Sequence, residues 1–119
     1  MSKYLNLCYS ESGDCMKIII SNKEIPLYVA DNYFKRLTGL MFKKNIDYAL
    51  LFKKCNGIHT FFMKEDIDVI LTDKNNNILY IYPNLKPWKI ILPKKNVFNT
   101  YELPKGSITK KIKSIKITE

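Results

Sequence analysis

The sequence lacks several features that would have restricted its class of function. It contains no apolar run as long as a membrane span, and its first residues, MSKYLNLCYSESGD, lack the apolar core of a signal peptide. Three cysteines cannot all pair within one chain, which argues against a secreted disulfide framework. We therefore expect a soluble cytoplasmic protein without a membrane span.

Arginine is nearly absent, although the chain is basic. Arg36 is the single arginine among 20 basic residues, and the formal net charge is +9. A net positive charge of this size can indicate binding to nucleic acid or to an anionic membrane. Readers of nucleic-acid sequence use Arg for bidentate contacts, however, whereas the Lys residues here are spread along the chain. Nucleic acid is therefore not the expected partner, and binding of an anionic polymer through the Lys-rich surface is kept as an alternative.

Long helical patterns are also missing, and short apolar runs rich in Ile, Val, Tyr and Phe take their place. Turn residues separate these runs at spacings of about 8–12 residues, which is typical of a small β-sandwich or barrel. We predict about eight short strands and one short helix near residues 32–38, which Asp31 would cap and Gly39 would end. Residues 1–14 are expected to form a loose segment, and residues 15–119 a single β domain.

Chemically reactive residue types concentrate between Cys55 and Asp73. This stretch holds the single histidine, His59, and three acids, of which Asp68 lies among apolar residues. We predict one strand over residues 58–64, which would carry His59. A thiolate beside an imidazole is the basis of a cysteine nucleophile, but the spacing of Cys55 and His59 is not specific for one. No catalytic residue is therefore predicted.

A metal site has little support in the sequence. His59 could join Asp68 and Glu102 around a divalent ion, but no motif supports that set. The chain has enough cysteine and histidine residues for a Cys₃His zinc site, yet no CxxC pair supports such a site. Its members would be Cys8, Cys15, Cys55 and His59. No metal ion or other cofactor is therefore predicted.

Asp68 needs a partner if its strand is buried, because an unpaired buried charge is very costly. Arg36 is the natural partner, since it is the single arginine and precedes the turn at Gly39. The pair would either tie the helix to the sheet or bind a polar ligand in a pocket. Trp88, which follows Pro87, would cover one end of the core or form a wall of that pocket.

Several motifs resemble the family called "domain of unknown function 192". Residues 36–42, RLTGLMF, are similar to its R-x-x-GLM-[F/Y] signature, and residues 58–69 contain elements similar to its IHTFFM and ID-[V/I] centre. Residues 86–88, KPW, and 101–106, YELPKG, resemble its PW and ELPAG elements. The resemblance runs from about Met16 to Ile117 and so covers nearly the whole chain.

The resemblance implies a mainly β fold, namely a jelly-roll-like sandwich or a distorted barrel with a short helix at the GLM segment. The family is found in bacteria and archaea, and it implies no reaction, because its biochemical activity is not established. The motif positions that the resemblance carries over are Arg36, His59, Met63, Asp68, Trp88 and Glu102. The positions expected to serve the structure are Gly39, Leu40, Met41, Met63 and Gly106.

We predict a small binding or accessory domain with a polar pocket on a β scaffold. Its partner would be a small polar ligand or another protein, and the chain would be a monomer or a weak dimer. The pocket candidates are Arg36, His59, Phe62, Asp68, Trp88 and Glu102. The alternative is a hydrolytic or metal-assisted enzyme in which His59 acts with Asp68 or Glu102 as a general base.

Overall fold

The computed structural model describes residues 16–20, 22–30, 38–108, 112 and 114–118, which form nine β-strands. In chain order they are β1 (Lys17–Ile20), β2 (Lys23–Val29), β3 (Ala49–Lys53), β4 (Ile58–His59), β5 (Ile67–Thr72), β6 (Ile78–Leu85), β7 (Ile90–Ile91), β8 (Asn99–Pro104) and β9 (Lys116–Thr118). The prediction of a mainly β fold is confirmed. Of the predicted helix, only Thr38 lies within the described residues.

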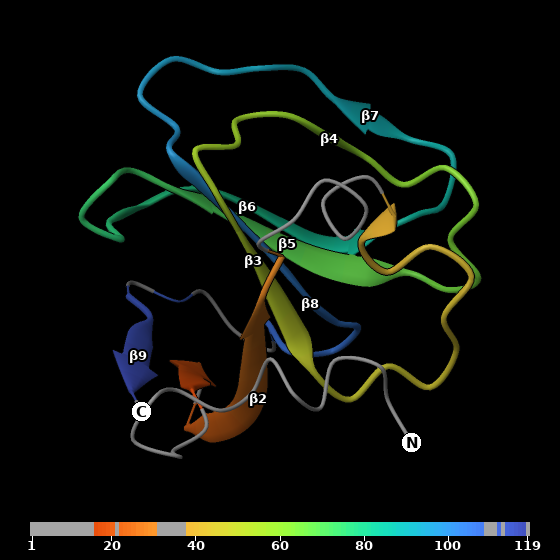
Figure 1. Cartoon of the computed structure of the whole chain (residues 1–119), viewed down its shortest axis with the longest axis horizontal. Coiled ribbons are helices and arrows are strands. Elements are labelled where there is room, and N and C mark those ends of the chain that lie inside the picture. The colour runs from red at the N-terminus through yellow and green to blue at the C-terminus, as the bar shows by residue number, and fades with distance from the viewer. Residues whose placement is uncertain (1–15, 21, 31–37, 109–111, 113, 119) are drawn as a thin grey trace.

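Seven of these strands form one curled sheet in the order β6-β5-β8-β3-β2-β1-β9 (Figure 1). β2 and β3 pair in parallel, whereas the other neighbours pair antiparallel. β4 and β7 form a separate two-stranded ribbon, which runs beside the curled sheet (Figure 1). Within the described part of the chain, no helix is long and apolar enough to cross a membrane.

The three adjacent strands β5, β8 and β3 are buried on both faces, so alternate residues enter two different cores. The core on the side of the β4–β7 ribbon, here the ribbon-side core, includes Leu50, Phe52, Val69, Leu71 and Ile91. The core on the side of the β1–β2 hairpin, here the hairpin-side core, includes Ile18, Leu51, Ile70, Tyr101 and Leu103. This alternation decides which polar side chains can share a site.

The prediction of one strand over residues 58–64 is wrong, because pairing ends at His59 and the chain turns at Thr60. The Thr60 side chain is buried, and its hydroxyl donates to the Lys86 carbonyl at 2.7 Å. The same hydroxyl accepts the Lys89 N–H at 2.8 Å. Phe62 then takes a positive φ of 63°, which no continuous strand permits. Side-chain bonds to a distant segment therefore replace the expected ladder.

Candidate functional site

Glu102 is a buried carboxyl group near the middle of the curled sheet. It lies on β8 between Leu50 of β3 and Val69 of β5, and it faces the ribbon-side core with them. Glu102 is only 5% exposed, and its Oε1 atom has no hydrogen-bond partner in the described structure. Burial raises the pKa of Glu102 to about 8, although a hydrogen bond from the Leu40 backbone N–H acts in the opposite direction. A neutral carboxyl is therefore the main form near pH 7.

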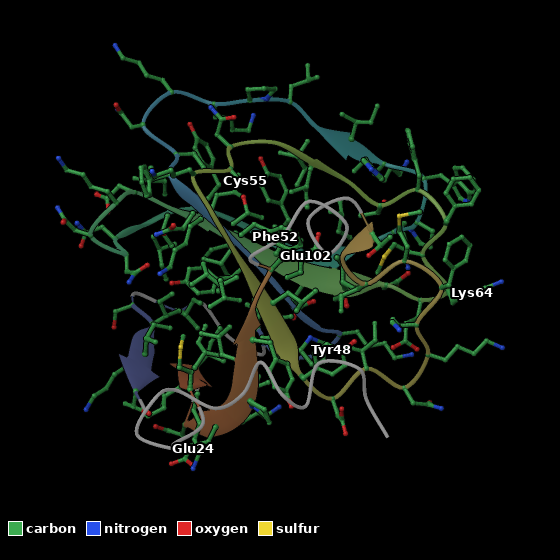
Figure 2. All side chains as sticks on the ribbon, in the orientation of Figure 1. Glu24, Tyr48, Phe52, Cys55, Lys64 and Glu102 are labelled. Atoms are coloured by element: carbon green, nitrogen blue, oxygen red, sulfur yellow. The ribbon has the colours of Figure 1, made fainter. Side chains whose placement is uncertain are left out.

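The turn at Gly39 brings the backbone against this carboxyl. Gly39 has a φ of +48°, in the left-handed region that glycine tolerates best. A Cβ atom at this position would lie 3.1 Å from Oε1 of Glu102 and 3.2 Å from Cζ of Phe52. Figure 2 shows Phe52 and Glu102 together in the interior, whereas Glu24 lies at the periphery. The missing side chain of Gly39 therefore leaves room beside the carboxyl group.

A small cavity of about 90 Å³ opens at Glu102. Its lining is mostly apolar, and its polar side chains come from four residues. The apolar part includes Leu40, Met41, Phe52, Ile58 and Met63. The polar part consists of Thr38, Cys55, His59 and Glu102. A concave, mostly apolar lining with a few convergent polar groups is a feature of small-ligand sites, although this cavity is smaller than most of them.

His59 and Cys55 line the cavity but are engaged locally. Nδ1 of His59 accepts the Phe61 N–H at 3.2 Å, which leaves the proton on the other ring nitrogen. The Cys55 thiol donates to the Gly57 carbonyl at 3.3 Å. Among the described residues, no hydrogen bond joins either side chain to Glu102. The geometry thus assembles neither a thiol–imidazole dyad nor a histidine–carboxylate pair.

Asp68 lies on the opposite face of the sheet from Glu102. It precedes Val69, the residue in register with Glu102, so its side chain points to the hairpin-side core. Asp68 is fully buried and accepts the backbone N–H groups of Asn84 at 2.9 Å and Ile108 at 2.7 Å. Within the described part of the chain, both carboxylate oxygens of Asp68 thus accept backbone N–H groups. Asp68 and Glu102 therefore do not share a cavity.

Two of the remaining pocket candidates, Phe62 and Trp88, lie away from the cavity. Arg36 falls outside the described residues, so the predicted Arg36–Asp68 pair is not described. Phe62 and Trp88 are exposed and contact each other edge to face, with ring centroids 4.8 Å apart. Neither lines the cavity at Glu102. Of the six pocket candidates, the structure thus brings together His59 and Glu102.

A second, larger groove of about 510 Å³ is lined by residues of β4 and β7 and by the segments next to these strands. It shares Cys55, Gly57, Ile58 and His59 with the cavity at Glu102. Its remaining wall includes Phe61, Ile90 and Leu92. Sequence reasoning missed this groove, because residues 90–92 are all apolar and the sequence does not show that Ile90 and Leu92 are exposed while Ile91 is buried.

The described residues contain no group of three or more His, Cys, Asp or Glu side chains that could hold a metal ion. The zinc set considered above depends on Cys8 and Cys15, which lie outside these residues. The divalent set depends on Asp68, which faces the hairpin-side core.

Comparison with protein families decides the family. Residues 16–115 match the model of DUF192, described as "Uncharacterized ACR, COG1430". The chain belongs to the DUF192 family. It is 44% identical over 84 residues to UPF0127 protein PH1112 of Pyrococcus horikoshii, covering 66% of this chain and 71% of that protein. It is 38% identical over 98 residues to UPF0127 protein PF1050 of Pyrococcus furiosus, covering 76% of this chain and 83% of that protein.

Other relatives are longer. The chain is 37% identical over 86 residues to a UPF0127 protein of Thermococcus sibiricus, where the match spans 67% of this chain and 55% of that protein. The chain thus spans about half the length of this relative.

Two crystal structures share the fold. A protein of Sinorhizobium meliloti 1021, whose printed name suggests a role in transcription regulation, matches with a TM-score of 0.70 and 16% identity over 87% of this chain and 90% of that one. A protein of unknown function from Novosphingobium aromaticivorans matches with a TM-score of 0.69 and 12% identity over 87% and 83%. At these identities the likeness extends to the fold alone.

Proposed function

We propose that this DUF192 chain is a binding domain that takes the polar end of a small organic ligand into the cavity at Glu102. The observation that carries the proposal is the unpartnered Oε1 atom of Glu102 beside a cavity of about 90 Å³. An unsatisfied buried polar group costs roughly 1–3 kcal/mol, so a ligand that bonds to it recovers that free energy. The local engagement of Cys55 and His59 supports binding over catalysis.

The protonation state of Glu102 indicates the kind of polar group. With a pKa of about 8, the carboxyl is mainly neutral near pH 7 and can both donate and accept a hydrogen bond. A primary carboxamide also donates and accepts, so it can pair with a neutral carboxyl through two bonds. We therefore propose a carboxamide, or a group of the same donor and acceptor pattern, as the polar end.

The dimensions of the site support a ligand with an apolar body. A water molecule occupies about 30 Å³ in the liquid, so a cavity of about 90 Å³ admits only a few non-hydrogen atoms. The neighbouring groove of about 510 Å³ offers Phe61, Ile90 and Leu92 to a larger apolar part. The proposed ligand thus places its polar end at Glu102 and its apolar part toward the ribbon.

Butyramide and 2-pentanone are matched probes for this proposal, because they have similar size but only the amide can donate a hydrogen bond. In a ¹⁵N-resolved titration near pH 7, butyramide should shift the backbone amides of Gly39 and Leu40, and 2-pentanone should bind about tenfold more weakly. Glu102→Leu should abolish the shifts. Glu24→Leu, which removes an exposed acid, should leave them unchanged. Equal shifts in Glu102→Leu, or none in the native chain, would refute the proposal.

A further inference from the structure

Three exposed aromatic residues form a contiguous cluster at neighbouring turns. Phe42, Phe62 and Trp88 are 59%, 47% and 59% exposed. The ring centroids of Phe42 and Phe62 lie 5.6 Å apart, and those of Phe62 and Trp88 lie 4.8 Å apart. Large aromatic side chains are usually buried in monomeric soluble proteins, so a cluster of three on the surface calls for an explanation.

The backbone at all three positions is strained. Phe42, Phe62 and Trp88 have φ values of 65°, 63° and 66°, whereas five of the other six non-glycine residues at positive φ are asparagines. Asparagine tolerates this region, but a bulky side chain there costs of order 1–3 kcal/mol and persists only when its surroundings enforce it. Such strain concentrates at functional sites, because it serves to position particular side chains.

The turns that carry these side chains are bound to one another. The Phe42 N–H donates to the Phe62 carbonyl at 3.0 Å, and the Trp88 N–H donates to the Thr60 carbonyl at 3.0 Å. The buried hydroxyl of Thr60 adds the bonds to the Lys86 carbonyl and the Lys89 N–H. These contacts hold the three strained turns together, so their outward-facing rings are fixed as a unit.

The cluster extends along the β4–β7 ribbon. The ring of Phe61 stacks on Trp88 with centroids 5.6 Å apart, and Phe61 also lines the groove of Ile90 and Leu92. Ile90 and Leu92 are 59% and 69% exposed. We call these six residues the aromatic strip: Phe42, Phe61, Phe62, Trp88, Ile90 and Leu92.

Positive charge borders the aromatic strip. Lys44, Lys64 and Lys89 are exposed and lie within two residues of a strip member in sequence. Figure 2 shows Lys64 extending outward at the edge of the molecule. The two nearest acids in sequence are engaged, because Glu65 accepts the backbone N–H groups of Asn45 and Ile46 and Asp66 pairs with Lys86 at 2.7 Å. Glu65 keeps its negative charge and Asp66 is offset by Lys86, so Lys44, Lys64 and Lys89 leave the sequence around the strip with a net positive charge.

We propose that the aromatic strip docks on an anionic lipid surface. Aromatic and aliphatic side chains beside lysines suit a membrane interface, where the rings enter the headgroup region and the lysines meet negative lipids. Lysine acts there as a hydrated point charge and needs no bidentate geometry. The aromatic strip shares Phe61, Ile90 and Leu92 with the groove proposed for the apolar part of the ligand, whereas Phe42, Phe62 and Trp88 line neither that groove nor the cavity at Glu102. Vesicle binding does not depend on a ligand at Glu102.

Other occupants fit the strip less well. A second copy of this chain, with the same net charge of +9, would bring the same lysines together. An acidic protein is usually recognised through arginine forks, and the chain has one arginine. Nucleic-acid bases bind by stacking on aromatic ring faces, but Phe61 already stacks on Trp88, and Ile90 and Leu92 provide no ring.

Trp88 supplies a direct test, because it is the single tryptophan of the chain. The full chain would be mixed with vesicles of phosphatidylcholine alone, or of phosphatidylcholine with 30 mole per cent phosphatidylglycerol (about one lipid in three), at roughly 0.05 M and 0.5 M salt. We expect co-sedimentation and a blue shift of Trp88 emission with the anionic vesicles at low salt. The neutral vesicles should bind at least about tenfold more weakly.

The decisive variant is the double substitution Phe42→Asn and Phe62→Asn. Asparagine suits the positive φ at both turns, so the fold is retained while two rings are removed. We expect at least about a tenfold loss of vesicle binding. The control is Leu79→Thr, which replaces an exposed apolar residue of β6 outside the strip and should bind like the native chain.

Several results would overturn the proposal. One is the absence of binding to anionic vesicles. Another is binding without a shift of Trp88 emission, or binding that the double variant retains, because charge alone would then explain it. A third is that the vesicles fail to bind while the chain forms a concentration-dependent dimer or binds poly-glutamate or oligothymidylate. Loss of that interaction in the double variant would assign the strip to the other occupant.

Discussion

The buried carboxyl of Glu102 makes the stability of this protein depend on pH. Its folded-state pKa of about 8 lies above the ordinary value of 4.5, so the folded state holds a proton that the unfolded state releases. The corresponding stability is fully present below about pH 4.5 and is lost as the pH rises toward 8. This direction is opposite to that of a typical paired carboxylate.

Glu102→Gln isolates this contribution, because glutamine is neutral at every pH. Between pH 4.5 and 8, the native chain should lose on the order of 3–5 kcal/mol of unfolding free energy relative to Glu102→Gln. Urea unfolding of both proteins at pH 5, 7 and 9 measures the difference, in which all other titrating groups cancel. A difference that stays constant with pH would show that the carboxyl is not buried.

Asp68 serves stability in another way. Its carboxylate accepts two buried backbone N–H groups, from Asn84 and Ile108, so Asp68→Ala leaves both without a partner. We expect a loss of about 2–4 kcal/mol of unfolding free energy, measured by urea denaturation near pH 7. Asp47→Ala, at an exposed position, should change it by less than about 0.5 kcal/mol. Similar losses in the two variants would contradict this role for Asp68.

At the scale of the element, the turn of residues 39–41 leaves room for the cavity because Gly39 has no side chain. Gly39→Ala adds a Cβ atom at a φ of +48° and within 3.2 Å of Glu102 and Phe52. We expect a loss of about 2–4 kcal/mol and no binding of butyramide, from the sum of backbone strain and crowding. Thermal unfolding and the amide titration are the measurements.

Gly106 provides the matched control for that turn. It has a φ of +80°, but a Cβ atom there would meet nothing within 4 Å. Gly106→Ala should therefore carry only the backbone strain, about 1 kcal/mol, and should retain butyramide binding. If both alanine variants bind butyramide equally, Gly39 does not shape the cavity.

Thr60 joins the β4 turn to the turn before β7. Thr60→Val keeps the shape of the side chain but removes its bonds to the Lys86 carbonyl and the Lys89 N–H. We expect a loss of about 1–3 kcal/mol, together with faster hydrogen exchange at the Lys89 amide. Exchange at the amide of Val69, in the middle of β5, should change only with global stability. Unchanged exchange at Lys89 would mean that the two turns hold together without the hydroxyl.

Elements set by local pattern could be predicted from the sequence. Along β5, for example, Val69 faces one core, and Asp68 and Ile70 face the other, because the side-chain period of a strand fixes those faces. The prediction of a strand over residues 58–64 is wrong, because the turn at Thr60 is held by hydrogen bonds to Lys86 and Lys89, which are 26 and 29 positions away. The pattern of apolar residues along the chain does not indicate a side-chain hydrogen bond to a distant residue.

Assembly of the site belongs to the whole molecule. Glu102 meets Leu50 and Val69 only through the order β5-β8-β3, which no local signal encodes. The sequence indicated His59 and Glu102 as polar residues of interest, but it could not show that Asp68 faces the other core. Strand register, and not residue type, decides which candidates share a cavity.

The cavity at Glu102 has no residue in common with the aromatic strip, although the neighbouring groove shares Phe61, Ile90 and Leu92 with it. The cavity at Glu102 lies between the curled sheet and the β4–β7 ribbon, and the aromatic strip lies on the exposed side of the ribbon and its turns. If both proposals hold, the double variant Phe42→Asn and Phe62→Asn should retain butyramide binding, and Glu102→Leu should retain vesicle binding. The amide titration and vesicle sedimentation, run on both variants, measure this independence. Loss of both activities in either variant would contradict it.

The most direct test of the account is the titration of the Glu102 carboxyl carbon by ¹³C NMR, with and without butyramide. Glu102→Gln identifies the resonance. The account predicts a pKa of about 8 in the free chain and a clear change in the carboxyl resonance when butyramide is added at pH 7. A pKa near 4.5, or a resonance that butyramide leaves unchanged, would contradict the claim that Glu102 is a buried, unpartnered group that receives a ligand.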